Sequence, residues 1–316
     1  MLRKLVILAA VLAVVVAAVL WFLTIPTSVP ASALAPRTPD LANGRTMFWA
    51  GGCASCHATP KQEDKTRLGG GLALATPFGT FHVPNISPDA KDGIGGWDEA
   101  QFVSAMLRGN EDGEHLYPAF PYPSYAHMRL DDVRDLFAFM KTLPAVSGAV
   151  PPHDLKFPFN FRRAVGLWQL LFLDTTTFRP DPGKSAQWNR GAYLVNGPGH
   201  CAECHSPRNL LGGIVASQRF AGGPNPVGQG WIPNITQKGI GDYSEKDIAE
   251  ILATGLTPSG DFVGGPMAEV VRTISELSPE DRAAMAVYLK SLPPVEGPKP
   301  PEQPKAPEQP KAPEQK

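Results

Sequence analysis

The clearest feature of the hydrophobic pattern is an uncharged apolar run from Leu5 to Leu23, which follows Arg3 and Lys4. A membrane-spanning helix needs about 20 apolar residues, whereas the apolar part of a cleaved signal peptide has about 7–15. We therefore expect residues 1–25 to be a signal-anchor helix, with its basic end in the cytoplasm and the remaining chain exported. The small residues Ala31-Ser32-Ala33 fit a cleavage site, so a removed signal peptide stays the alternative.

Helical periodicity returns in two segments that resemble each other, Asp131 to Pro144 and Glu280 to Pro293. Each begins with acidic residues, spaces its apolar residues three and four apart, carries a lysine near its end and stops at proline. Leu41–Trp49 and Trp188–Val195 have the pattern of shorter helices. The chain is therefore predicted to be mainly α, with two units that each have an opening and a terminal helix.

The stretches between these helices are duplicated as well. Pro84-Asn85-Ile86 in the first unit corresponds to Pro233-Asn234-Ile235 in the second, and each is followed by a glycine-aromatic signal and another helical pattern. A repeat of this length indicates two homologous units rather than one domain with two sites. We expect the units at residues 40–145 and 186–295, with a linker over 26–39 between the anchor and the first unit.

Residues 146–185 connect the units and are rich in proline, which predicts extended and turning chain. Residues 163–173 within this strap include Trp168, Leu170 and Leu171. We expect them to form a short helix packed across both units, because an apolar patch of that size is rarely left bare; a plain linker is the alternative. Residues 296–316 are low-complexity Pro-Glu-Gln-Lys-Ala sequence and predict a disordered tail.

Composition narrows the possible functions. The formal net charge is −1, so no strongly basic surface for nucleic acid is expected. The 34 prolines and 31 glycines predict much irregular chain, which needs an apolar centre other than a large sheet. All four cysteines fall within two pentapeptides, so none is left for a structural disulfide.

The two pentapeptides are Cys53-Ala54-Ser55-Cys56-His57 and Cys201-Ala202-Glu203-Cys204-His205. Cys-x-x-Cys-His attaches a c-type haem: the two thiols bind the two vinyl groups of one porphyrin, and the histidine is the proximal ligand of the iron. A zinc site would not explain the histidines, and the βαβ pattern of a redox dithiol is absent. We predict two covalent haem c groups, attached through Cys53, Cys56, Cys201 and Cys204, with His57 and His205 as axial ligands.

The sixth iron ligand decides whether a haem only transfers electrons or also reacts with small molecules. Met267 lies in a glycine-proline loop just before the last helix and is the predicted ligand of the second haem. In the first unit Phe120 stands near the place where the methionine is expected. Met128 is the nearest methionine and is the predicted ligand there; the alternatives are His127, His115 or an open position.

The chain resembles the multihaem cytochrome c subunits of bacterial membrane-associated alcohol, aldehyde and gluconate dehydrogenases, over nearly all of residues 40–295. The residues that carry the resemblance are Thr76-Pro77-Phe78-Gly79-Thr80, His115-Leu116-Tyr117-Pro118-Ala119-Phe120-Pro121-Tyr122, Phe157-Pro158-Phe159-Asn160, Trp188-Asn189-Arg190-Gly191-Ala192-Tyr193-Leu194-Val195, Cys204-His205-Ser206-Pro207-Arg208-Asn209 and Gly265-Pro266-Met267-Ala268-Glu269-Val270-Val271. The resemblance implies two tandem class I cytochrome c domains behind an N-terminal transmembrane helix. Two departures stand out: family members commonly have three haem domains, and they often have methionine where Phe120 stands.

The resemblance also implies a diheme subunit that takes electrons from the catalytic subunit of a periplasmic dehydrogenase. The electrons then pass to quinone or to a downstream cytochrome or oxidase. We expect no catalysis by the chain itself and a location at the inner membrane, with the haem domains in the periplasm. The alternatives are a diheme enzyme, peroxidase-like or thiosulfate-oxidising, and a membrane-anchored cytochrome shuttle. A diheme enzyme needs an open or unusual sixth position, which only the loop from Phe120 to Met128 permits.

Overall fold

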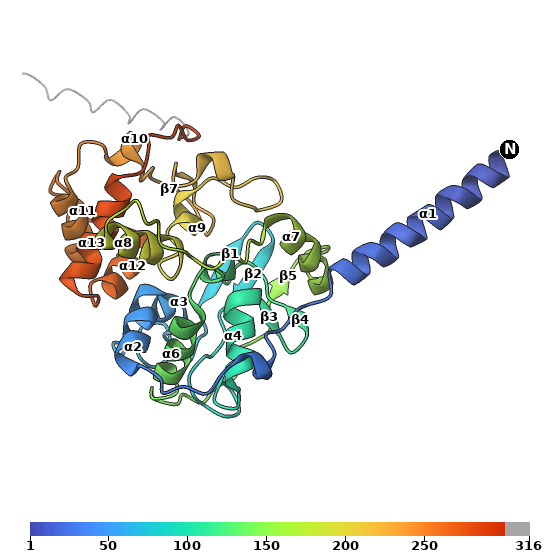
Figure 1. Ribbon diagram of the computed structural model, residues 1–316, viewed down its shortest axis with the longest axis horizontal. Coiled ribbons are helices and arrows are strands. Elements are labelled where there is room, and N and C mark those ends of the chain that lie inside the picture. The colour runs from blue at the N-terminus through green and yellow to red at the C-terminus, as the bar shows by residue number, and fades with distance from the viewer. Residues whose placement is uncertain (301–316) are drawn as a thin grey trace, which may run out of the picture.

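The apolar N-terminal run forms one long helix, α1 (Leu2–Leu23), which extends away from the rest of the molecule in the computed structural model (Figure 1). None of its residues is buried, and its length and composition suit a membrane span. A signal sequence would have the same properties. The structure describes residues 1–300, so most of the predicted tail, 301–316, lies outside the described residues.

Short helices make up most of the two units that follow (Figure 1). Those of the first unit are α2 (Leu41–Ala50), α3 (Cys53–His57), α4 (Glu99–Arg108), α5 (Tyr122–Tyr125) and α6 (Leu130–Met140). Those of the second are α8 (Ala186–Asn196), α9 (Ala202–His205), α10 (Gln237–Ile240), α11 (Glu245–Thr254), α12 (Pro266–Ile274) and α13 (Pro279–Lys290). The predicted mainly helical fold is confirmed, and the four predicted opening and terminal helices are α2, α6, α8 and α13.

The glycine-rich stretches predicted to be irregular contain small antiparallel sheets. β1 (Ala73–Thr76) and β2 (Gly79–His82) form a hairpin, and β5 (Asp154–Leu155) from the strap adds a third strand beside β2. Two further pairs are β3 (Asn110–Glu111) with β4 (Glu114–His115) and β6 (Gly223–Pro224) with β7 (Trp231–Ile232). The pairing of β5 with β2 fixes the start of the strap to the first unit.

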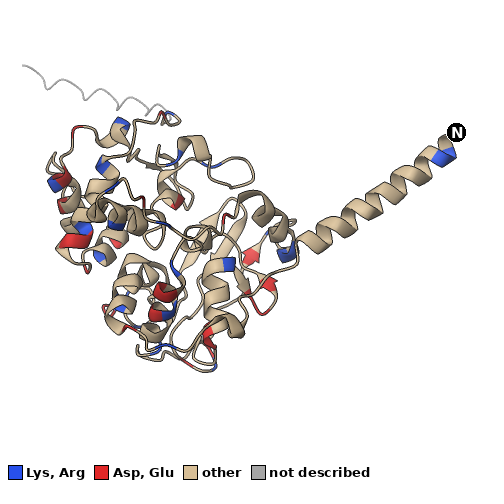
Figure 2. Ribbon diagram, viewed as in Figure 1, with Lys and Arg blue, Asp and Glu red and all other residues tan. Residues whose placement is uncertain are grey.

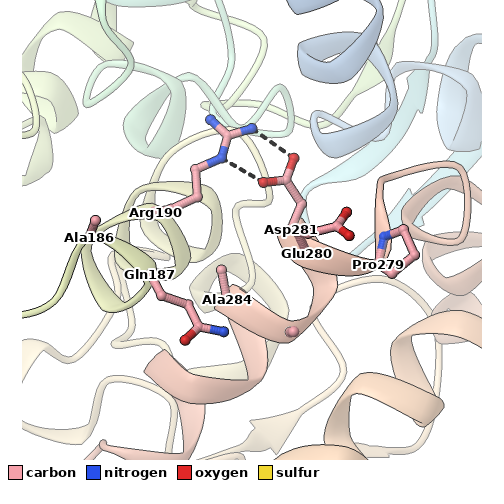
Figure 3. Close-up of a pocket in the computed structure, with 8 residues that line it drawn as sticks. Ala186, Gln187, Arg190, Pro279, Glu280, Asp281 and Ala284 are labelled. Atoms are coloured by element: carbon pink, nitrogen blue, oxygen red, sulfur yellow. Dashed lines mark hydrogen bonds and ion pairs between the residues drawn. The ribbon is translucent and has the colours of Figure 1, made fainter.

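In each unit the opening helix crosses the terminal helix at a glycine. A Cβ atom at Gly44 of α2 would overlap the backbone oxygen of Asp135 in α6, and one at Gly191 of α8 would overlap that of Ala284 in α13. The second crossing also has an ion pair between Arg190 and Asp281, with N–O distances of 2.7 and 2.8 Å (Figure 3). The backbones approach so closely that only glycine fits.

One helix of each unit, α4 in the first and α11 in the second, is bounded by its own sequence signals. Asp98 and Gln101 form a capping box at the start of α4, and Ser244 and Asp247 form one at the start of α11. Both helices end at a glycine in the left-handed conformation, with φ of 57° at the end of α4 and 79° at the end of α11. The duplicated sequence therefore produces duplicated local structure.

The predicted helix of the strap is present as α7 (Val165–Phe172). Its Gln169 side chain donates to the backbone oxygens of Arg108 and Gly109 in the first unit, and Trp168 Nε1 donates to the oxygen of Leu211 in the second. The helix therefore contacts both units. The expectation that its apolar side chains are covered is wrong, because one face of α7 stays exposed among the described residues.

Candidate haem sites

Each Cys-x-x-Cys-His motif folds as a short helix, α3 over the whole first motif and α9 from Ala202 in the second, and all four cysteines are half-buried. In the first motif α3 follows Gly52, whose φ of 60° turns the chain sharply after α2. All four cysteines are free of disulfides, so their sulfur atoms are available for thioether bonds. Burial raises the pKa of Cys53 to about 12 and that of Cys56 to about 11. Burial raises the thiol pKa in the second motif too, to about 12 for Cys201.

The histidines that end the motifs are held in one tautomer. Nδ1 of His57 lies 2.8 Å from the backbone oxygen of Pro84, and Nδ1 of His205 lies 2.8 Å from that of Pro233. Because a carbonyl oxygen only accepts, Nδ1 carries the proton, and the lone pair of each ring is on Nε2. Burial lowers the pKa of His57 to about 4 and also lowers that of His205, so both rings are neutral. A neutral imidazole with a free Nε2 is the form that binds iron.

The loops that carry these two proline carbonyls are fixed by the asparagine that follows each proline. Asn85 Nδ2 donates to the oxygen of Val146 over 2.6 Å, and Asn234 Nδ2 donates to that of Val295 over 2.8 Å. Their Oδ1 atoms accept from the backbone two residues on, over 2.9 and 2.8 Å. Each asparagine thus ties the loop that orients the histidine to the chain just after the terminal helix. The sequence showed this repeat but gave these residues no role.

These donors fit a covalently bound haem and not a metal ion alone. The described residues contain no group of three or more His, Cys, Asp and Glu side chains that would hold a metal, so the zinc alternative finds no support there. Trp49 Nε1, four residues before Cys53, is buried and has no hydrogen-bond partner among the described residues, and a haem carboxylate would supply one. The pocket in Figure 3 lies between α8 and α13 and includes neither motif.

The predicted sixth ligands differ in their surroundings. Met267 is partly buried at the start of α12, directly after Gly265 and Pro266. Met128 is 1 % exposed, and its Cγ is 3.7 Å from the position that a Cβ on Gly197 would take. Met128 therefore lies at the contact between the units.

The two histidine alternatives already bond to the protein. Nε2 of His115 lies 2.8 Å from the backbone oxygen of Thr24, and Nδ1 of His127 lies 2.7 Å from that of Thr176. By the same reasoning as for the motif histidines, these ring nitrogens carry protons. His115 would have to give up its bond to bind iron through Nε2, whereas Nε2 of His127 has no hydrogen bond to any residue within 1–300.

The attachment motifs of the two units are neighbours across the contact between the units. The ring of His200, just before the second motif, lies 5.6 Å from that of Tyr125, whose hydroxyl donates to the oxygen of Gly51, just before the first motif. Helix α12, which carries Met267, packs against α2 and α3 of the first unit.

A buried carboxylate joins the second motif to the first unit. Glu203 stands between Cys201 and Cys204 and accepts a hydrogen bond from the Ser124 hydroxyl over 2.7 Å. Its other oxygen pairs with Arg208 over 2.7 Å. Sequence reasoning missed this contact, because nothing in the spacing of Ser124 and Glu203 indicates that they meet.

Comparison with known proteins gives a consistent result. The cytochrome c family model matches residues 41–144. A diheme cytochrome c-type protein of Cereibacter sphaeroides is 50% identical over 283 residues, which are 89% of this chain and 95% of that protein. The fructose dehydrogenase cytochrome subunit of Gluconobacter japonicus is 36% identical over 84% of this chain. The cytochrome c subunit of the quinone alcohol dehydrogenase of Gluconacetobacter polyoxogenes is 35% identical over 82%. The chain spans 54% and 58% of these two dehydrogenase subunits, about half of their length.

Proposed function

Because the chain belongs to the diheme c-type cytochromes, with two covalently bound haem c groups, we propose that it conducts electrons from a periplasmic dehydrogenase to quinone or to a downstream cytochrome or oxidase. The observation that supports this proposal is that residues in or next to each attachment motif contact the other unit, through the Tyr125–His200 ring contact and the hydrogen bond from Ser124 to Glu203. When bound, the haem iron supplies the one-electron change between its ferric and ferrous states. The protein supplies the position of the two sites and the tautomer of each histidine.

In this proposal residues 40–145 and 186–295 are tandem class I cytochrome c domains. The haems are attached through Cys53 and Cys56 in the first and Cys201 and Cys204 in the second. His57 and His205 bind the irons through Nε2, as the bonds of their Nδ1 atoms to proline carbonyls favour. Because the two sites are similar, they suit electron transfer from one haem to the other better than a division into a catalytic haem and an electron-donating haem.

We assign Met267 as the sixth ligand of the second haem and Met128 as that of the first. Met267 is supported by its place at the start of α12, after a glycine-proline turn. Met128 is supported by its burial and because Nε2 of His115 is bonded to a carbonyl. A methionine opposite histidine raises the reduction potential, which suits an electron acceptor.

The dehydrogenase partner is proposed from the relatives, whose names include cytochrome subunits of fructose and alcohol dehydrogenases. The inner membrane is proposed as the location, with α1 retained as an anchor and the haem domains in the periplasm. The length of α1, 22 residues without burial, supports a span.

Mild detergent purification from native membranes tests the proposal. We expect a dehydrogenase catalytic subunit to copurify, and the haems of the complex to become reduced when its substrate is added. A chain that purifies alone and consumes peroxide, with a high-spin signal in the oxidised state, would contradict electron transfer as the sole role and favour the diheme enzyme. A chain that purifies alone in low-spin form would favour the shuttle.

A further inference from the structure

Helix α7 leaves an apolar face uncovered. Leu167, Leu170 and Leu171 are 42, 51 and 66 % exposed, and their spacing of three and four residues places them on one side of the helix. The other side is held firmly: Gly166 is buried, and Gln169 bonds to the first unit. The exposure of the leucines therefore does not come from a loosely attached helix.

Neighbouring side chains extend this face into a patch. Trp168 Nε1 bonds to the oxygen of Leu211, and Leu210 and Leu211 are 101 and 61 % exposed at the tip of their turn. Phe159, which is 45 % exposed, packs with its ring 4.8 Å from that of Phe78 beside the same turn. We call these residues the apolar patch: Phe159, Leu167, Leu170, Leu171, Leu210 and Leu211. Contiguous exposed apolar side chains of this kind indicate a surface that something covers.

The patch lies directly beside the end of α1. The guanidinium of Arg163 donates to the oxygen of Trp21 over 2.7 Å and lies 4.6 Å from the centre of its ring. Thr24, the residue after α1, is 5 % exposed; its oxygen bonds to His115 and its side chain packs against Gly166. In Figure 1 α7 lies at the base of α1, and in Figure 2 α7 carries no charged residue while a basic segment stands where α1 meets the body.

We propose that the apolar patch rests in the outer boundary of the lipid bilayer, with a phospholipid surface as its occupant. This inference rests on the membrane anchoring proposed above. A span that ends at Leu23 brings the bilayer surface to Trp21 and Arg163, and α7 begins within two residues of that arginine. Apolar side chains in the acyl boundary, with an arginine and a tryptophan at the headgroups, are the arrangement of an interfacial helix.

The consequence is a fixed orientation of the haem units. A single spanning helix alone leaves a domain free to rotate above the membrane, whereas a second contact beside it removes this freedom. Because α7 is bonded to both units through Gln169 and Trp168, the lipid contact would keep both units at a fixed distance from the membrane surface. The patch therefore adds a membrane-orienting function to the strap.

Site-directed spin labelling tests this inference. Single cysteines are introduced as Leu171→Cys in the patch and Phe262→Cys in the second unit, and the holoprotein is labelled with a nitroxide and placed in phosphatidylethanolamine–phosphatidylglycerol liposomes. Labelling is selective because the native cysteines are in thioethers. The two sites are matched, since Leu171 is 66 % and Phe262 is 72 % exposed. A third variant, Leu12→Cys, reports on the middle of α1.

We expect the label at residue 171 to collide with oxygen several-fold more, relative to a water-soluble nickel complex, than the label at residue 262. Equal, water-like accessibility at both sites would overturn the inference, and so would a label at 171 shielded from both reagents, which indicates a protein contact. The label at residue 12 distinguishes the failures: a lipid-like signal there with a water-like signal at 171 leaves the anchor intact and removes only the patch. A water-like signal at residue 12 contradicts the anchor itself.

Discussion

Glu203 offers a sharp test of how the two haem units are held together. Its side chain joins the second attachment motif to Ser124 of the first unit and to Arg208 of its own, and the residue is 8 % exposed. Glu203→Ala removes both bonds; it leaves the Ser124 hydroxyl without this acceptor and leaves the Arg208 guanidinium only its bonds to the backbone oxygens of Glu203 and Gly212. Glu203→Gln keeps the shape of the side chain and its acceptor for Ser124, but it removes the charge.

The size of the effect follows from the two bonds. A hydrogen bond to a charged group contributes about 1.5–3 kcal/mol, so two of them give roughly 3–6 kcal/mol. The Arg208 side chain is 24 % exposed, so water replaces part of its lost partner, and the lower end applies. We therefore expect Glu203→Ala to lower the free energy of unfolding by about 3 kcal/mol and Glu203→Gln by about half of that.

An exposed ion pair between the units serves as the control. Arg45 and Glu276 lie 3.0 Å apart, with side chains 55 and 44 % exposed. An exposed pair contributes about 0–1 kcal/mol, so Glu276→Ala is expected to change the free energy of unfolding by about 0.5 kcal/mol or less. The two variants thus compare a buried with an exposed contact across the same boundary.

The assay is urea unfolding of the detergent-solubilised holoprotein, followed by far-ultraviolet circular dichroism and by the Soret band. Urea is uncharged and does not screen ion pairs, whereas guanidinium chloride is a salt and does screen them. If Glu203→Ala and Glu276→Ala shift the midpoint equally, the argument from burial is refuted. If Glu203→Gln costs as much as Glu203→Ala, the hydrogen bond to Ser124 does not contribute as argued.

Two further variants test the ligand assignment and the helix crossing. Met267→Leu is expected to lower the reduction potential of one haem by on the order of 0.1–0.3 V, which is part of the ~0.8 V range that axial ligands span. The control is Met285→Leu, a buried core residue, which should leave both potentials unchanged. A redox titration of Met267→Leu that matches the unsubstituted protein would exclude Met267 as a ligand. Gly191→Ala places a methyl group against the backbone oxygen of Ala284, so we expect it to lower the free energy of unfolding by about 3 kcal/mol or to prevent folding. The control is Gly264→Ala, where an added Cβ would meet no described atom within 4 Å, and we expect thermal melts to show little change in its stability. Equal stability of the two glycine variants would contradict the close crossing.

The parts of the structure that the sequence predicted depend on local signals. The helices α6 and α13 follow from acidic first turns, helical spacing and a terminal proline, and all of these act within a dozen residues. The repeat added a second copy of each signal, which made the division into similar units visible. The attachment cysteines and histidines were named from one motif, whose chemistry fixes its spacing.

The parts that the sequence did not predict depend on how the units dock. The sequence does not indicate that Ser124 and Glu203 are partners, because 79 residues separate them along the chain. The strap was expected to cover its leucines with protein, since burial is the usual outcome for such a segment. Instead α7 packs one face against both units and leaves the other face exposed beside the end of α1.

The contact between the units is made by the same segments that hold the cofactors. Helix α12 carries Met267 and packs on α3, and Ser55 within the first motif donates to the backbone oxygen of Glu269 over 3.3 Å. A shift of one unit would therefore move an attachment helix, the helix that carries Met267, or both, and the core around them resists such a shift because its packing leaves few voids. The separation of the two attachment motifs is thus fixed by the contacts that stabilise the fold. We therefore expect Glu203→Ala, which loosens the boundary, to slow electron transfer between the haems more than Glu276→Ala does.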